Sequence, residues 1–146
     1  MTAPDIEDVE GCEFCDVIAG RASGPPIAYE DGHFLVFVGR YQPTGEGYAL
    51  VVPRAHVRDL HQLPDDECGR TLAMVRRVSR AMQSAFSVTG TTIVQNTGPP
   101  GQSVMHLHFH IVTRRTGDDY VRKAARAESE QELHRQAAVL RASLSQ

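Results

Sequence analysis

The sequence lacks any apolar run of about 18 residues, the length at which a segment becomes a candidate membrane-spanning helix. It also begins without the basic segment and apolar stretch that are typical of a secretory signal. We therefore expect a cytoplasmic protein with no membrane partner. Residues 1–11 are small, polar and acidic, and they predict a flexible N-terminal tail.

An excess of charge of one sign is also missing, because 15 basic residues stand against 18 acidic ones, for a net charge of -3. The two signs are interspersed, so no extended field attracts a nucleic-acid backbone, and we expect no nucleic-acid partner. The chain has neither a Gly-x-x-x-x-Gly-Lys motif nor a carboxylate cluster suited to magnesium. We therefore expect chemistry that requires no divalent metal ion.

Cysteine is scarce, and internal repeats and linkers are absent. A chain of 146 residues with 41% hydrophobic content can form one domain with a core that needs no disulfide bonds. Beside the tail, we predict a main domain over residues 12–115 and a C-terminal extension over residues 116–146.

Short β-branched and aromatic segments between turn-forming residues predict five strands, at 27–30, 34–38, 48–52, 91–95 and 107–113. A short helix is expected at 13–20. One long amphipathic helix follows Pro64, with apolar residues at helical spacing: Leu72, Val75, Val78, Met82, Ala85 and Phe86. A capping box of Ser129 and Glu132 predicts a terminal helix with the apolar residues Leu133, Ala137, Leu140 and Leu144. The pattern predicts an α+β fold, an antiparallel sheet of about five strands with helices on one side.

The most informative segment is His106-Leu107-His108-Phe109-His110-Ile111-Val112, in which histidines alternate with apolar residues. On a strand this alternation puts the three imidazoles on one face and the apolar side chains on the other. Alternate strand residues lie roughly 6.5 to 7 Å apart, so one metal ion cannot bind all three rings. A histidine-rich strand facing solvent is the plain alternative, but clustered imidazoles usually serve as ligands or as acid–base groups.

Cys12 and Cys15 form a Cys-x-x-Cys pair, which fits a redox dithiol, two small buried residues or half of a zinc site. A tetrahedral zinc needs two more nitrogen or sulfur ligands, and the sequence offers His56 and His106. A zinc held by these four protein ligands would be structural, because a catalytic zinc keeps an open position. Cys68 is expected to be a packing residue.

The stretch at 101–112 resembles the signature of the histidine triad (HIT) family of nucleotide hydrolases and transferases. Further matching segments are Cys12-Glu13-Phe14-Cys15, Tyr29-Glu30-Asp31, residues 50–56 and Asn96, so the resemblance covers about residues 12–115. It implies a HIT-like fold and a homodimer whose sheets join edge to edge. Some bacterial members have a zinc site that resembles the Cys12, Cys15, His56 and His106 set.

The resemblance also implies roles for individual residues. His108 would attack the α-phosphate of a nucleotide, forming a covalent nucleotidyl-histidine, while a backbone carbonyl anchors its other nitrogen. His110 would hold a non-bridging oxygen, and Gln102 would contact the α-phosphate or the bridging atom, which makes these three the catalytic candidates. The phosphate-binding set is Asn96, Gln102, Ser103, Val104, His108 and His110. An ordinary turn around Pro99-Pro100 is the plain alternative for this glycine-rich loop.

The implied function is a nucleotide hydrolase or nucleotidyl transferase that acts on a nucleoside phosphoramidate or a related nucleotide. The alternatives are a dinucleoside polyphosphate hydrolase, a zinc-stabilised nucleotide-binding or interaction module with incidental turnover, and a redox dithiol protein. Two positions depart from the family pattern. Tyr48 stands where relatives commonly have histidine, and Arg40 stands where they have a ribose-binding Asp or Asn. We therefore expect a different preference for the leaving group or the nucleoside.

Overall fold

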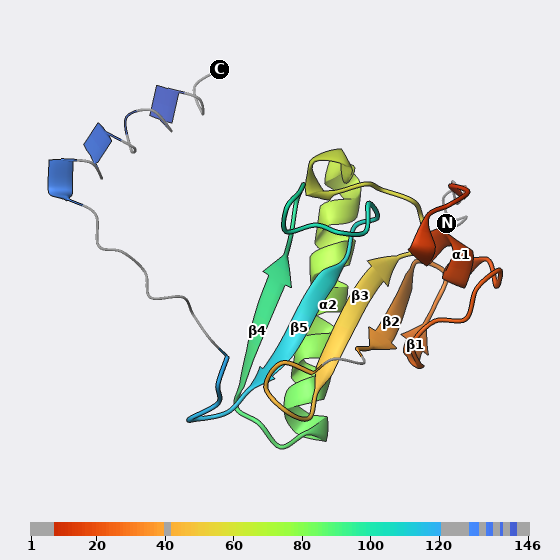
Figure 1. Ribbon diagram of the computed structural model, residues 1–146, viewed down its shortest axis with the longest axis horizontal. Helices are drawn as coiled ribbons and strands as arrows, with labels where there is room; N and C mark the ends of the chain where they lie inside the picture. The colour runs from red at the N-terminus through yellow and green to blue at the C-terminus, as the bar shows by residue number, and fades with distance from the viewer. Residues whose placement is uncertain are drawn as a thin grey trace.

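The computed structural model of the chain describes residues 8–39, 42–120, 129–131, 134–135, 138 and 141–142 (Figure 1). Its strands are β1 (Ile27–Glu30), β2 (Phe34–Val38), β3 (Tyr48–Pro53), β4 (Gly90–Gln95) and β5 (Phe109–Arg114). Its helices are α1 (Glu13–Ile18), the 3-10 helix η1 (Leu60–Gln62) and α2 (Asp65–Ala85). The α+β class is confirmed. None of the described helices combines the length and the apolar composition that a membrane crossing requires.

The five strands form one antiparallel sheet in the order β1-β2-β3-β5-β4. Figure 1 shows α2 lying lengthwise along one face of this sheet. The first turn of α2 carries Asp65, Asp66 and Glu67, whose negative charges complement the positive end of the helix dipole. The expected long amphipathic helix is therefore confirmed at its predicted position.

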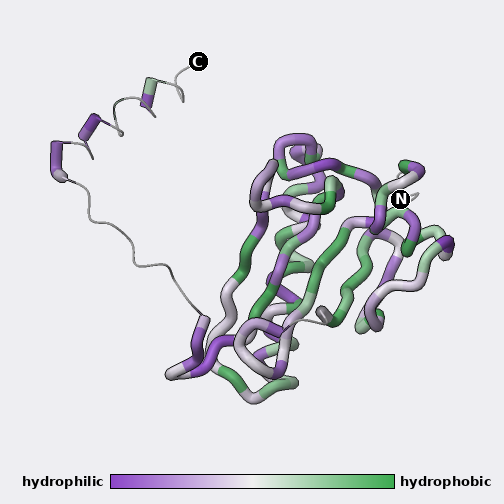
Figure 2. Tube along the Cα trace, in the orientation of Figure 1, coloured by the Kyte–Doolittle hydropathy of each residue, from purple (hydrophilic) through white to green (hydrophobic). Residues whose placement is uncertain are grey.

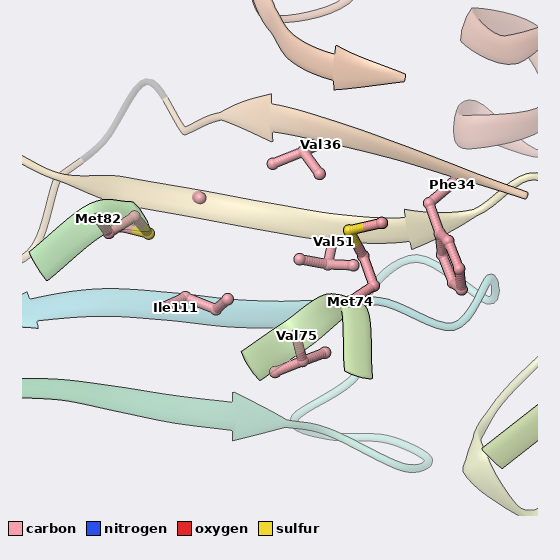
Figure 3. Packing of buried hydrophobic residues seen from close by; sticks show 8 residues of the cluster. Phe34, Val36, Val51, Met74, Val75, Met82 and Ile111 are labelled. Carbon is pink, nitrogen blue, oxygen red and sulfur yellow. The ribbon is translucent and has the colours of Figure 1, made fainter. Parts of the chain in front are cut away.

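The main core lies between α2 and the sheet (Figure 3). Phe34 and Val36 of β2 and Val51 of β3 point toward Val75 and its neighbours on α2. Figure 2 shows hydrophobic residues concentrated along β2 and β3, the central strands of this packing. Full burial of each such side chain contributes roughly 1.5 to 3 kcal/mol, so this layer holds the helix on the sheet.

Part of the opposite face of the sheet is covered by α1, so the expectation of helices on one side is wrong. Phe14 of α1 packs with Leu35, Phe37 and Val52, which alternate with the α2-facing residues. The reason lies in β2, whose sequence Phe-Leu-Val-Phe-Val is apolar at every position and needs cover on both faces. This second, smaller core positions α1 beside the histidines.

Leu72 does not belong to the core-facing stripe of α2, contrary to the expectation, because 64% of its surface is exposed. The buried stripe instead includes Thr71, Met74, Val75, Ser79 and Met82. Leu72 lies at the β4 edge of this stripe, because helical spacing places it on the same side of α2 as Ser79, whose hydroxyl contacts Thr91 of β4, the end strand of the sheet.

The last strand begins at Phe109, two residues later than predicted, so His106 and His108 lie in irregular chain just before it. The ladder between β3 and β5 ends at the pair Val51 and Phe109. Two residues further along β3 stands Pro53, which has no N–H to continue the ladder, and Leu107 donates to the Val57 carbonyl instead. The chain is therefore free to bend at His106.

Three predictions fall wholly or partly on residues outside the described ones. The N-terminal tail at 1–11 is one of them, because residues 1–7 lie outside. Arg40, the departure at the expected ribose site, is another. The terminal helix is covered only in part, because Glu132, Leu133, Ala137, Leu140 and Leu144 also lie outside.

Candidate functional site

A cleft of about 920 Å³ lies between α1, the start of β3 and the chain that leads into β5. Four of the predicted phosphate-binding residues line it: Ser103, Val104, His108 and His110. The described lining does not include the other two, Asn96 and Gln102. The cleft also receives Phe14 from α1 and Tyr48 from β3, and neither was assigned a role from the sequence.

His108 is fixed in one tautomer by the main chain. Its Nδ1 lies 2.8 Å from the carbonyl oxygen of His106, and only 7% of the residue is exposed. Because a carbonyl oxygen can only accept, Nδ1 carries a proton, and the neutral ring therefore has its lone pair on Nε2. The ring of His108 also contacts the edge of Phe14, with a distance of 5.2 Å between ring centroids. The imidazole is thus held on two sides in a single tautomer.

His110 lies directly beside His108, with 4.9 Å between the ring centroids. Its Nδ1 is 2.5 Å from the Tyr48 hydroxyl oxygen, and the two rings are stacked. Burial lowers the pKa of His110 to about 4, with a smaller contribution from His108, so the ring is neutral at physiological pH. Sequence comparison marked Tyr48 as a departure but gave no sign of this contact.

The loop between β4 and β5 is braced by Gln102, which is almost fully buried. Its amide nitrogen donates to the carbonyl oxygens of Arg58 and Val104 at 2.7 and 3.0 Å. Its amide oxygen accepts from the Gly98 N–H at 2.8 Å. These three bonds engage both the amide nitrogen and the amide oxygen of the side chain, so a catalytic role for Gln102 stays a prediction. In this conformation it positions Ser103 and Val104 at the cleft.

The four predicted metal ligands lie together beside the cleft. One ligand atom from each of Cys12, Cys15, His56 and His106 lies within 4.8 Å of all the others. The sulfur atom of Cys15 is 3.3 Å from Nδ1 of His56 and 3.6 Å from Nδ1 of His106, and that of Cys12 is 3.5 Å from the latter. A tetrahedral zinc with ordinary bond lengths separates its sulfur and nitrogen ligands by about 3.6 Å. The donor set and its spacing fit zinc.

Neighbouring groups and burial set the protonation of these side chains in a way that suits a metal ion. Nε2 of His106 lies 2.7 Å from the Pro53 carbonyl, so it carries the proton and leaves Nδ1 available to the cluster. Burial lowers the pKa of His106 to about 4, so the ring is neutral at physiological pH. Burial also raises the pKa of the Cys15 thiol, so a cation is needed to hold the thiolate there. Two imidazoles beside the thiols favour a metal site over a redox dithiol.

Phe14 connects the cysteine–histidine cluster to the cleft. It stands between the two cysteines on α1, and its ring contacts both His106 and His108 at centroid distances of 5.7 and 5.2 Å. Phe14 therefore couples the position of α1 to that of the His108 ring.

Comparison with known proteins gives a consistent result. Residues 25–117 match the HIT domain family. The chain is 35% identical over 106 residues to "Protein hit" of Bacillus subtilis, covering 72% of each protein. It is 33% identical over 104 residues to the adenosine 5'-monophosphoramidase hnt1 of Schizosaccharomyces pombe, covering 70% of this chain and 74% of that protein.

Among solved structures, the chain is similar to a zinc-bound histidine triad family protein from Mycobacterium smegmatis. The TM-score is 0.68 at 30% identity, and the match covers 93% of this chain and 98% of the other.

Proposed function

The chain belongs to the histidine triad (HIT) family, and from that premise we propose that it cleaves nucleoside phosphoramidates or related nucleotides at the α-phosphate. The observation that carries this proposal is the bond from Nδ1 of His108 to the His106 carbonyl, which leaves a nucleophilic Nε2 at the cleft. The similarity to a yeast phosphoramidase supports the same reaction class.

We propose a reaction in two displacement steps. Nε2 of His108 forms a bond to the α-phosphorus while the P–N bond breaks, and the departing amine takes up a proton from solvent. Water then attacks the phosphorus and gives up a proton to solvent, the bond to His108 breaks, and a nucleoside monophosphate leaves. His110, which lies beside His108, would stabilise negative charge on a non-bridging oxygen. An acceptor other than water would make the protein a nucleotidyl transferase.

The charge of the cleft favours phosphoramidates over dinucleoside polyphosphates. Its described lining contains the carboxylates of Glu13 and Asp16, whereas no lysine or arginine is among these residues. Asp16 is paired with Arg21 at 2.7 Å, which leaves Glu13 as the main source of negative charge in this lining. A polyphosphate leaving group is strongly anionic, while an amine leaving group is neutral or cationic, so a lining with a carboxylate and no cation favours release of an amine.

Mass spectrometry after brief mixing with adenosine phosphoramidate tests the proposed function. We expect a fraction of the protein to gain the mass of one nucleotidyl group, and peptide mapping should locate it on His108. The adduct should disappear on longer incubation, as water completes the reaction. Turnover without any adduct, or an adduct on another residue, would contradict the covalent route through His108.

We infer that the cysteine–histidine site holds a structural zinc, because all four ligand positions come from the protein. When bound, the metal would supply a crosslink between α1, the end of β3 and the chain before β5. Cys12 and Cys15 would hold it from one side, and His56 and His106 from the other. The zinc-bound relative supports the presence of the metal.

We also propose a homodimer that forms along β4, the edge strand next to β5. The Ser79 hydroxyl lies 2.7 Å from that of Thr91, so the flank of α2 that carries Leu72 faces this edge. Ile93 shares the strand face of Thr91 and is 47% exposed, which leaves two apolar side chains uncovered at one edge.

The dimer proposal predicts that Ile93→Glu and Leu72→Glu each shift the protein toward a monomer, because a carboxylate in an apolar interface is costly to desolvate. Size-exclusion chromatography with light scattering measures the mass directly. Leu60→Glu is the matched control, since Leu60 is a similarly exposed leucine in η1 and should leave the mass unchanged. A wild-type protein that is monomeric at micromolar concentration would refute the proposal.

A further inference from the structure

Tyr48 contacts a triad histidine across two strands. It is the first residue of β3, and its side chain shares a sheet face with that of Leu50, the cross-strand partner of His110. Its ring lies nearly parallel to that of His110, at 10° and 5.9 Å between centroids. Its hydroxyl oxygen is 2.5 Å from Nδ1, and both residues line the cleft. The Tyr48 phenol therefore lines the cleft and is hydrogen-bonded to the His110 ring.

The direction of this hydrogen bond decides what His110 presents to a ligand. Burial raises the pKa of the Tyr48 phenol, with a smaller contribution from Tyr120, so the hydroxyl keeps its proton. His110 is neutral and therefore carries a single N–H. The titratable group beside it on the same segment of chain is His108. If the phenol donates to Nδ1, the ring proton must stand on Nε2. The reverse bond would leave Nε2 bare, and a bare nitrogen cannot donate to an anion.

The backbone at Gly39 makes room for the tyrosine ring. A Cβ at this position would overlap the Tyr48 ring carbons Cδ1 and Cε1. The Gly39 N–H donates to the Tyr48 carbonyl at 2.8 Å, so the two residues are also joined through the main chain. Any side chain at 39 would therefore push the ring away from its place against His110.

We propose that Tyr48 is a positioning residue that holds His110 as the Nε2–H tautomer, so that His110 donates a hydrogen bond to a non-bridging oxygen of the bound phosphate. The inference rests on the function proposed above and extends it. His108 and His110 then present opposite tautomers to the substrate: a bare Nε2 to attack phosphorus, and a protonated Nε2 to bind its oxygen. The Gly39 and Tyr48 pair secures the second of these states.

The test is Tyr48→Phe, which removes the hydroxyl and keeps the ring. Nitrogen-15 NMR of ligand-free protein distinguishes protonated from bare imidazole nitrogens, and wild-type His110 should show the proton on Nε2. In the variant we expect a mixture of tautomers and a fall in kcat of about 10-fold, less than the loss of a whole oxyanion donor. The melting temperature should change little. Tyr29→Phe is the matched control, because that hydroxyl bonds Asp31 away from the cleft.

Gly39→Ala provides a second route to the same result, since it displaces the ring and keeps the hydroxyl. We expect the same change in the His110 nitrogen shifts, and a double variant with Tyr48→Phe should lose little more kcat than either single variant. Proton density on Nδ1 in the wild type, or unchanged shifts and kcat in Tyr48→Phe, would overturn the proposal. The nitrogen shifts can be measured without turnover, so they determine the tautomer in every case. Wild-type protein that cleaves no phosphoramidate would refute the proposed function, and the shifts would still decide the tautomer.

Discussion

Replacing His108 with asparagine should lower kcat for phosphoramidate cleavage by about 10⁴-fold or more, because removal of a nucleophile closes the covalent route. Asparagine suits the site, since its amide N–H can still donate to the His106 carbonyl that now binds Nδ1. The packing against Phe14 and His110 should therefore survive, and the loss should appear in kcat. Steady-state kinetics with a fluorogenic adenosine phosphoramidate measures the change.

Ligand binding by the same variant separates an enzyme from a binding module. We expect His108→Asn to bind adenosine monophosphate within about 10-fold of wild-type affinity in titration calorimetry, since the rest of the cleft is intact. His61→Asn is the control, because His61 is an exposed histidine of η1 outside the cleft, and it should keep full activity. A variant that retains a tenth of wild-type turnover would show that His108 is not the nucleophile.

Loss of the metal should produce the largest effect on stability. Cys15→Ala removes a buried ligand from a site that joins three segments of the chain. A metal that binds only the folded state stabilises it by about 4 kcal/mol when its free concentration is about 1,000 times Kd. For a domain of this size each kcal/mol corresponds to about 4 °C, so we expect the melting temperature to fall by about 15 °C. Scanning calorimetry and zinc analysis by mass spectrometry make the measurement.

The same change should also reduce activity, because Phe14 lies between the two cysteines and contacts the His108 ring. Cys68→Ala is the matched control, since Cys68 lies on α2 outside the cluster and is exposed, so the expectation of a packing residue is wrong. Chelation of wild-type protein should reproduce the lower melting temperature, and added zinc should restore it. Wild-type protein that contains no zinc and melts at the same temperature with and without chelator would refute a structural metal.

The local elements follow from the sequence alone. Strands β1 and β2 have the predicted bounds, and β3, β4 and α2 differ from theirs by one residue or less where bounds were given. Period-2 and helical spacing depend on neighbouring residues, which is why they could be recognised without coordinates. The cysteine–histidine cluster was also foreseen, because a Cys-x-x-Cys pair fits half of a zinc site and the resemblance to zinc-binding HIT proteins supported His56 and His106 as the other half.

The structural features that could not be predicted from the sequence depend on contacts between segments that are far apart in the chain. The ladder between β3 and β5 ends where Pro53 lacks an N–H, and this bend sends His106 to the cysteines while His108 stays at the cleft. In a regular strand the side chains of His106 and His108 would lie on the same face of the sheet. The cover on the second face of the sheet and the exposure of Leu72 likewise depend on which elements pack together.

By itself, then, the sequence determined the α+β class, the positions of the strands and the side chains that we propose as metal ligands and nucleophile. The tertiary structure decided how these side chains are placed. Cys15 meets His106 across 91 residues, and Tyr48 meets His110 across 62. Such pairs form only when the sheet registers and the two cores bring the segments together. The hydrogen bonds of the histidines and the spacing of the cysteine–histidine cluster follow from those contacts, because each proton position depends on the atom that lies opposite it.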